Sequence, residues 1–401
     1  RLIDAEPVLE LLPNIAAGWL FQVQPVMAHG QPFMTIRGQA DGARFHCENH
    51  LEPGPVRSWD AVNAAGEAMA ALALALPAED SRIISLHAAA VEMAGRLVVF
   101  PNVRRAGKST LAAALAFAGH PVFTDDVLPL RFADNGSAQG VAMGLAQRLR
   151  MPLPPAAPAA MQAWVTGMPG PENRQYKYLL LPDQPRHGEA LPIGAFVILD
   201  RQEEVLAARL DRVRPDQAMD ALLHQNFTRD RHSQDVLQAI CTMLSGRPVF
   251  QLQYSDLADA VSCLRHAFTV WPEDLVPTST EARTFRMAEF PDRSPVPIRD
   301  DLALRQRPGC GAMRLGETLY LADPEGGAIH RMDSLAAEIW SVLGDAASPG
   351  DLKELLAAAF PDTDPGVMAQ DLDRLLQSFA VAGLIEEGGV EPYAAGLFAV
   401  A

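Results

Sequence analysis

One short segment constrains this chain more than any other: residues Leu97–Thr110 read LVVFPNVRRAGKST. The apolar run predicts a buried strand, the next residues predict a loop, and Ser109–Ala118 predicts a helix that ends at Gly119. Backbone N–H groups at the start of such a helix, together with a lysine, bind phosphate groups. The segment therefore predicts an α/β domain with a mixed sheet around a phosphate-binding loop.

Within this loop, Lys108 is predicted to reach the β- and γ-phosphates of a nucleotide, and Ser109 to hold Mg²⁺. The loop departs from the full glycine pattern, because Asn102 replaces the first glycine and two arginines replace small residues. Asparagine tolerates left-handed backbone angles, and the arginines either add positive charge or crowd the site. The predicted nucleotide-binding residues are Asn102, Arg104, Arg105, Ala106, Gly107, Lys108, Ser109 and Thr110.

An acidic pair, Asp125-Asp126, follows a predicted strand at Val122–Thr124. Carboxylates that face a phosphate-binding loop from the end of a strand suit one metal ligand and one general base. The alternative is an ordinary turn with two solvated acids. The pair is thus a candidate for the chemistry that accompanies nucleotide binding.

The order of the motifs between about residues 85 and 270 resembles the HPr kinase/phosphorylase family and its kinase relatives. The resemblance is carried by Leu86-His87-Ala88, Leu97–Phe100, Ala106–Thr110, Ala118-Gly119-His120 and Thr124–Val127. In that family ATP phosphorylates a protein serine. The resemblance implies that Lys108 binds phosphate and that Ser109 and Asp126 hold Mg²⁺. It also implies that Asp125 accepts the proton of the attacking hydroxyl, with His87 beside it. Relatives of this kind often form oligomers.

Two further basic residues are candidates for additional phosphate contacts: Lys177, within Tyr176-Lys177-Tyr178, and Arg229. The simpler interpretation of each is a surface charge.

A proline-rich segment, predicted as a linker over residues 276–305, separates this domain (81–275) from a module at 306–390 and a tail at 391–401. Two apolar runs, Ala312–Leu315 and Thr318–Ala322, flank Gly316-Glu317 and predict a hairpin. Three amphipathic helices follow, and Leu384-Ile385 begins a returning strand. This pattern predicts a small α+β module of winged-helix type.

Residues 308–388 resemble the PqqD family, a peptide-binding module also called a RiPP recognition element. The resemblance is carried by Ser334–Trp340, Gly344, Leu352–Phe360, Asp371-Leu372-Asp373 and Ala382–Ile385. It implies that a leader peptide binds as an added strand along the hairpin edge, against the third helix. The implied groove residues are Thr318, Leu319, Tyr320, Leu321, Leu372, Leu375 and Leu376. The alternative is that these residues form the core of the module.

The overall charge narrows the possible partners. The 401 residues include 33 Lys and Arg against 49 Asp and Glu, a formal net charge of −16. Such a chain has no general attraction for nucleic acid or an anionic membrane face. We find no apolar run long enough for a membrane span and no signal peptide, and the four scattered cysteines favour reduced thiols, so we expect a cytoplasmic protein. Residues 1–80 suggest no function; they complete the sheet or make an oligomer contact.

Two resemblances in one chain favour a kinase that uses ATP and Mg²⁺ to phosphorylate a Ser or Thr of a captured precursor peptide. The alternative is a catalytically inactive nucleotide-binding or peptide-docking chaperone of a peptide-modifying pathway. A third hypothesis, a small-molecule kinase or ATPase, leaves the peptide-binding module without a purpose.

Overall fold

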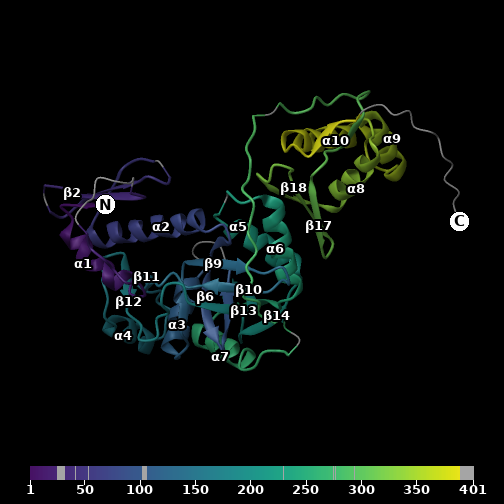
Figure 1. Ribbon diagram of the computed structural model, residues 1–401. Helices are drawn as coiled ribbons and strands as arrows, with labels where there is room; N and C mark the ends of the chain where they lie inside the picture. The colour runs from purple at the N-terminus through teal and green to yellow at the C-terminus, as the bar shows by residue number, and fades with distance from the viewer. Residues whose placement is uncertain are drawn as a thin grey trace. The chain divides into compact units, whose positions relative to one another are not determined.

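A computed structural model describes residues 1–24, 32–40, 42–52, 54–101, 106–228, 230–273, 275, 277–292 and 294–388. The chain divides into two compact units (Figure 1). Unit 1 comprises Arg1–Arg229 and Ala239–Arg286, and unit 2 comprises Asp230–Gln238 and Met287–Ala401.

Unit 1 begins with a small α+β layer. Its sheet has the strand order β1-β2-β3-β4, in which β1 runs parallel to β2 and the other neighbours are antiparallel. Two helices, α1 and α2, pack beside it around buried Val8, Ile36 and Phe45. The elements are β1 (Leu2–Ile3), α1 (Glu6–Ile15), β2 (Met34–Gly38), β3 (Phe45–Asn49), β4 (Arg57–Trp59) and α2 (Ala61–Glu79). Residues 1–80 therefore build a sheet of their own and do not complete the larger one.

Helix α2 is 19 residues long and begins at Asp60, whose carboxylate accepts the Asn63 N–H. Among the helices of the described residues, α2 alone is long and apolar enough, by length and composition, to cross a membrane. The sequence analysis found no such span, because it looked for an unbroken run of apolar residues. Eight of its residues are buried, most of them alanines, and one is Gly66. Small side chains let the helix approach its neighbours closely.

A mixed nine-stranded sheet forms the centre of unit 1, as the sequence predicts. Strand β13 runs parallel to β7 and β15, whereas the remaining pairs are antiparallel. The main path is β5-β9-β10-β13-β7-β6-β8, and β15 joins β13 to β14. The strands are β5 (Ile83–His87), β6 (Ala89–Met93), β7 (Arg96–Phe100), β8 (Val122–Thr124), β9 (Val127–Phe132), β10 (Ala138–Val141), β13 (Ala190–Arg201), β14 (Arg209–Arg212) and β15 (Val249–Tyr254).

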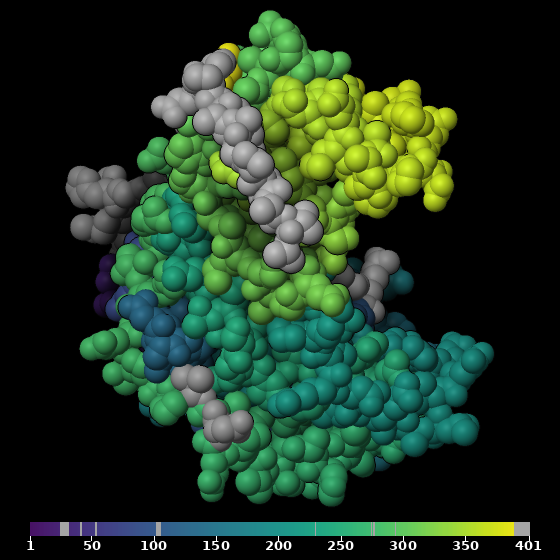
Figure 2. All heavy atoms as spheres, turned by 90° about the vertical axis from the view of Figure 1, so that its right-hand side faces the viewer, coloured from purple at the N-terminus to yellow at the C-terminus, as the bar shows by residue number. Residues whose placement is uncertain are grey.

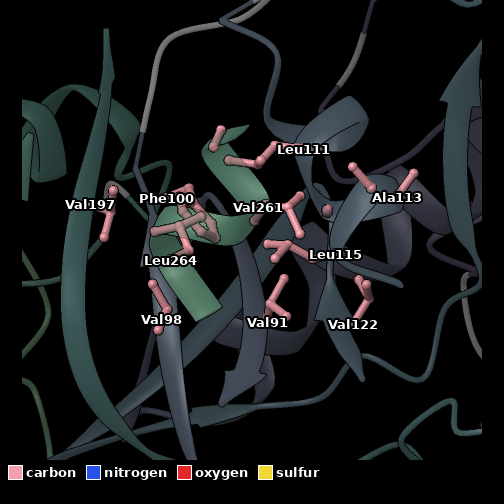
Figure 3. Close-up of a cluster of buried hydrophobic side chains, with 14 of the residues drawn as sticks. Val91, Val98, Phe100, Leu111, Ala113, Leu115, Val122, Val197, Val261 and Leu264 are labelled. Atoms are coloured by element: carbon pink, nitrogen blue, oxygen red, sulfur yellow. The ribbon is translucent and has the colours of Figure 1, made fainter. Parts of the chain in front are cut away.

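The core of this sheet lies under two helices, α3 (Lys108–Phe117) and α7 (Leu257–Ala267). Leu111 and Leu115 of α3 and Leu264 of α7 gather with Val98 and Phe100 of β7 in one buried cluster (Figure 3). Burial of these side chains fixes the first turn of α3 at the end of β7. The other elements are β11 (Gln147–Arg150), α4 (Ala159–Gly167), β12 (Tyr176–Leu179), α5 (Pro215–Gln225) and α6 (Ser233–Ser245).

Part of the predicted linker belongs to unit 1. Phe285 is 2% exposed and stacks edge-to-face on Phe132, with ring centroids 5.8 Å apart. The N–H of Arg283 donates to the Phe132 carbonyl oxygen. Aromatic burial therefore attaches this segment to unit 1 up to Arg286, where the boundary falls.

Unit 2 contains the predicted hairpin, three helices and a returning strand, and adds two strands that we did not predict. A third strand, β19, pairs with β18, so that the sheet order is β17-β18-β19. The returning strand β20 pairs with β16 instead of the hairpin. The elements are β16 (Leu304–Gln306), β17 (Gly311–Leu315), β18 (Thr318–Ala322), β19 (Ile329–Met332), α8 (Ser334–Val342), η1 (Leu343–Asp345), α9 (Pro349–Ala359), α10 (Pro365–Val381) and β20 (Ile385–Glu387).

Local capping explains where these helices begin. The Asp333 carboxylate accepts the Ala336 N–H at 2.8 Å, and Ser348 and Asp351 form a capping box. The core of unit 2 includes Trp340 and Phe379, whose rings meet edge-to-face at 5.9 Å. The outer side chains of α9 and α10 form one contiguous yellow region of the surface in Figure 2.

Candidate functional site

The first turn of α3 follows the predicted phosphate-binding loop. Gly107 precedes the helix with φ of +94°, a conformation that favours glycine, and no side chain caps the helix. Lys108 is 6% exposed, whereas Ser109 and Thr110 are half-buried. The N-terminal N–H groups of α3 are therefore suited to bind an anion. Asn102, Arg104 and Arg105 lie outside the described residues, as does Arg229.

The acidic pair lies beside this helix start. Asp125 is 7% exposed, and Oδ1 of its carboxylate accepts the backbone N–H of Arg148 at 3.2 Å. The Ser109 hydroxyl lies 3.5 Å from the Asp125 carbonyl oxygen. Burial, followed by the charge of Asp126, raises the pKa of the Asp125 carboxyl to about 7. A carboxylate with this pKa is suited to accept a proton near neutral pH.

Asp126 contacts two basic side chains. Its Oδ1 lies 3.1 Å from Nε2 of His87, and its Oδ2 lies 3.2 Å from Nη2 of Arg148. Burial alone raises the pKa of this carboxyl, but the His87 hydrogen bond and the positive charges of Arg148 and Lys108 outweigh it and hold the pKa below its usual value. Asp126 therefore stays ionised.

The register of the large sheet brings His87 to this position. Strand β5 pairs with β9 so that His87 lies opposite Val127, the residue after Asp126. The other ring nitrogen of His87, Nδ1, lies 3.0 Å from Oε1 of Gln225, at the end of α5. The predicted neighbourhood of His87 and the acidic pair is therefore present in the structure.

Arg148 is the residue of this cluster that the sequence interpretation missed. It lies on β11, opposite Tyr178 of β12, and its guanidinium stacks over the Tyr176 ring with the carbon 4.9 Å from the centroid. The neighbouring Gln147 donates from Nε2 to the Ser109 carbonyl oxygen at 2.9 Å. No local sequence pattern indicates this role for Arg148, because its acidic partner Asp126 lies 22 residues earlier in the chain, between β8 and β9.

Lys177 does not take part in this cluster. Its side chain is 6% exposed, and Nζ lies 2.8 Å from Oε2 of Glu172 and 3.3 Å from the Thr166 carbonyl oxygen. Neighbouring residues alternate between the faces of a strand, so Lys177 points away from the side on which Tyr176 meets Arg148. Lys177 is therefore not a surface charge, and its ammonium group contacts Glu172 and Thr166.

The oxygen atoms of Ser109 and Asp126 are the kind of ligand that Mg²⁺ takes, with few protein groups per ion. Among the described residues, His, Cys, Asp and Glu form no group of three or more that could hold a metal ion.

The groove predicted in unit 2 needs correction, because β18 is the central strand of its sheet. Both edges of β18 are hydrogen-bonded, to β17 on one side and to β19 on the other. A peptide strand therefore has no edge of β18 to join. Thr318, Leu319, Tyr320 and Leu321 are at most 8% exposed, and so are Leu372 and Leu376 of α10. The four leucines among them belong to the core of unit 2, and Leu375 alone of the predicted set is half-buried.

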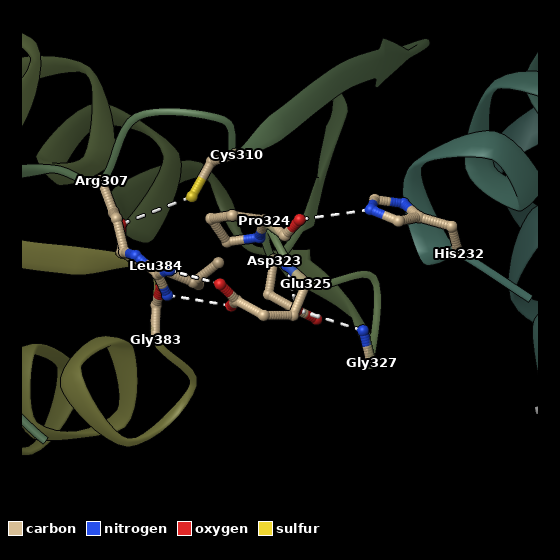
Figure 4. A network of polar contacts seen from close by, with 9 residues as sticks. All are labelled: His232, Arg307, Cys310, Asp323, Pro324, Glu325, Gly327, Gly383 and Leu384. Carbon is tan, nitrogen blue, oxygen red and sulfur yellow. Dashed lines mark hydrogen bonds and ion pairs between the residues drawn. The ribbon is translucent and has the colours of Figure 1, made fainter. Parts of the chain in front are cut away.

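The turn between β18 and β19 is held by a polar network (Figure 4). The Asp323 carboxylate accepts N–H groups from Glu325, Gly327 and Ala328. Glu325 pairs with Arg307, which also donates to the Gly383 carbonyl oxygen at 3.3 Å. Nε2 of His232 lies 3.2 Å from the Pro324 carbonyl oxygen. These contacts fix the point at which β19 begins.

Comparison with known proteins finds one family model over the C-terminal module. Residues 319–385 match a model described as coenzyme PQQ synthesis protein D (PqqD). A solved structure, the Hpr(Ser) kinase/phosphatase from Coxiella burnetii, is similar over 46% of this chain and 95% of its own, with 14% sequence identity and a TM-score of 0.24. No curated protein matches the chain.

Proposed function

We propose that this protein is an ATP-dependent kinase that phosphorylates a Ser or Thr hydroxyl of a precursor peptide bound by its PqqD domain. One observation carries the proposal: the start of α3 with Lys108 and Ser109 lies beside an ionised Asp126 and an Asp125 whose pKa is about 7. The cluster thus contains groups suited to bind a nucleotide phosphate, to bind a metal ion and to accept a proton.

The proposed reaction is an in-line displacement. The peptide hydroxyl oxygen bonds to the γ-phosphorus of ATP, the bond from that phosphorus to the bridging oxygen breaks, and ADP leaves with the electron pair. Asp125 accepts the hydroxyl proton. Lys108 binds the phosphates, and Ser109 and Asp126 hold Mg²⁺, which neutralises phosphate charge when bound.

The peptide is proposed to add to the outer edge of β19, the edge that faces away from β18. Within the described residues, β17 and β19 are the edges of the sheet in unit 2. Gly311 of β17 packs against the Gln234 side chain, which leaves no room there for a Cβ. We therefore favour β19, and its exposed residue Arg331 offers a test. Arg331→Pro, which removes a backbone donor from this strand, is expected to abolish leader-peptide binding, whereas Arg314→Pro on β17 is not.

A second candidate function, a peptide-docking protein without catalysis, is favoured by one observation. Both carboxylate oxygens of Asp126 already have partners, His87 and Arg148, which compete with a metal ion for them.

Calorimetric titration of ATP with Mg²⁺ into the wild type and Lys108→Ala separates the two. The kinase proposal expects micromolar to submillimolar binding that the variant loses while its melting temperature stays within a few degrees. Mass spectrometry should then detect phosphorylation of a Ser- or Thr-containing precursor peptide. A wild type that binds peptide but no nucleotide would establish the docking function instead.

A further inference from the structure

We propose that Arg148 is a catalytic residue that contacts the transferred phosphoryl group, and that helix α2 holds it in place. This inference rests on the kinase function proposed above. It also gives the N-terminal region, for which the sequence suggested no role, a part in the site.

The Arg148 guanidinium is held on several sides. Nη2 donates to Asp126 at 3.2 Å, and the planar group stacks on the Tyr176 ring. The side chain is 33% exposed, so it is half-buried while still reaching solvent. A cation fixed in this way needs little reorganisation to meet a charge that develops during a reaction.

Helix α2 closes another side of Arg148. A Cβ placed on Gly66 would lie 3.4 Å from Nη1 of Arg148 and 3.0 Å from the Tyr178 hydroxyl oxygen. The helix start is tied to the loop before β12, because Asn173 donates from Nδ2 to both carboxylate oxygens of Asp60 at 3.1 and 3.0 Å. A side chain at position 66 would therefore press first on the Tyr178 hydroxyl and would touch the Arg148 guanidinium.

Strand β11 also connects Arg148 to the helix start that is proposed to bind phosphate. Gln147 donates to the Ser109 carbonyl oxygen, and the next residue, Arg148, donates its backbone N–H to Asp125. The backbone that carries the guanidinium is therefore held against both the first turn of α3 and the acidic pair. A shift of either would move Arg148 with it.

Two cations, Lys108 and Arg148, act on the Asp126 carboxylate. The Arg148 side chain is partly buried, which strengthens its field. A transferred phosphoryl group, with charge on its three outer oxygens, is the species that such a fixed cation stabilises.

The test measures the affinity of the protein for two magnesium complexes. One contains a non-hydrolysable ATP analogue, which mimics the ground state, and the other contains ADP with aluminium fluoride, which mimics the transition state. For Arg148→Ala we expect the affinity for the ATP analogue to change less than about fivefold, while affinity for the aluminium fluoride complex and ATP turnover each fall about 100-fold or more. Arg148→Lys should recover only part of this loss, because it lacks the planar group that stacks on Tyr176.

Gly66→Ala should weaken binding of the aluminium fluoride complex by a smaller factor than Arg148→Ala. Its methyl group presses on the Tyr178 hydroxyl and touches the guanidinium, while alanine itself favours the helix. Matched controls are Arg150→Ala, from the same strand, and Gly167→Ala, a helical glycine with open space around it. Unchanged affinity for the aluminium fluoride complex in Arg148→Ala would overturn the inference, as would tighter binding of both nucleotide complexes, which would mean that Arg148 competes with the metal. A wild type that binds neither complex would refute the kinase function itself.

Discussion

His87 and Asp126 lie 3.1 Å apart, between Nε2 of the ring and Oδ1 of the carboxylate, although they belong to different strand ends. The pairing of β5 with β9 makes this contact, and Gln225 orients the ring from its other nitrogen. His87 is therefore positioned to hold one oxygen of the proposed metal ligand in a single orientation.

The first prediction concerns this orientation. His87→Ala removes the hydrogen bond to Asp126, and we expect phosphoryl transfer to fall about 10- to 100-fold because the carboxylate can rotate. Gln225→Leu should have a smaller effect of the same kind, since it leaves the ring in place without its partner. Steady-state kinetics at saturating ATP measures both, and a normal rate for His87→Ala would contradict the role.

The second prediction is a pH dependence of stability. The Asp125 pKa is about 7 in the folded protein and 3.8 in the reference state, so between these values the native state retains a proton that the unfolded chain releases. Stability from this group is complete below about pH 4 and is lost as the pH rises towards 7, at up to about 1.4 kcal/mol per pH unit. Asp125→Asn should remove this slope.

Urea unfolding at pH 5, 6 and 7, with a chelator present to remove divalent metal, measures the difference between wild type and Asp125→Asn. Asp126, whose pKa is lowered, changes its contribution only as the pH falls below about 4, outside this range. The comparison of the two proteins, rather than the wild-type curve alone, therefore tests Asp125. Parallel curves for the two proteins would mean that Asp125 titrates normally.

The third prediction separates Lys177 from the site. Lys177→Met keeps the buried stem but removes the ammonium group, whose partners are the Thr166 carbonyl and the largely exposed Glu172. We expect a loss of about 1 kcal/mol in unfolding free energy and no change in ATP affinity. Calorimetric titration with ATP measures this affinity, with Lys108→Ala as the positive control. A tenfold weaker affinity for ATP in Lys177→Met would show that Lys177 contributes to nucleotide binding.

Local patterns in the sequence were enough to predict α3, the acidic pair and the hairpin around Gly316-Glu317, because each depends on residues within a few positions. Arg148 was missed for the opposite reason. Its neighbours Asp126, Tyr176 and Gly66 come from three separate parts of the chain, and only long-range strand pairing and helix packing bring them together.

The groove in unit 2 was misplaced for a related reason. A strand is central only if it has a neighbour on each side. The second neighbour of β18 is β19, a four-residue strand (Ile-His-Arg-Met) without clear alternation of apolar and polar residues, so the sequence did not indicate it. Without β19, the Thr318–Ala322 strand had a free edge. All five residues of that strand are buried, so both of its faces are covered.

The last prediction tests this correction with two adjacent leucines of α10. Leu376 is fully buried in the core of unit 2, so Leu376→Ala should lower the unfolding free energy by about 2–5 kcal/mol. Leu375 is half-buried at the edge of the same core, so Leu375→Ala should lose less than about 2 kcal/mol. Because only Leu375 keeps apolar surface exposed, we expect its substitution to weaken leader-peptide binding at a temperature where both variants are folded. Hydrogen exchange of α10 and fluorescence titration with the peptide measure the two effects. If Leu376→Ala were as stable as the wild type, Leu376 would not be a core residue and the groove first predicted would be restored.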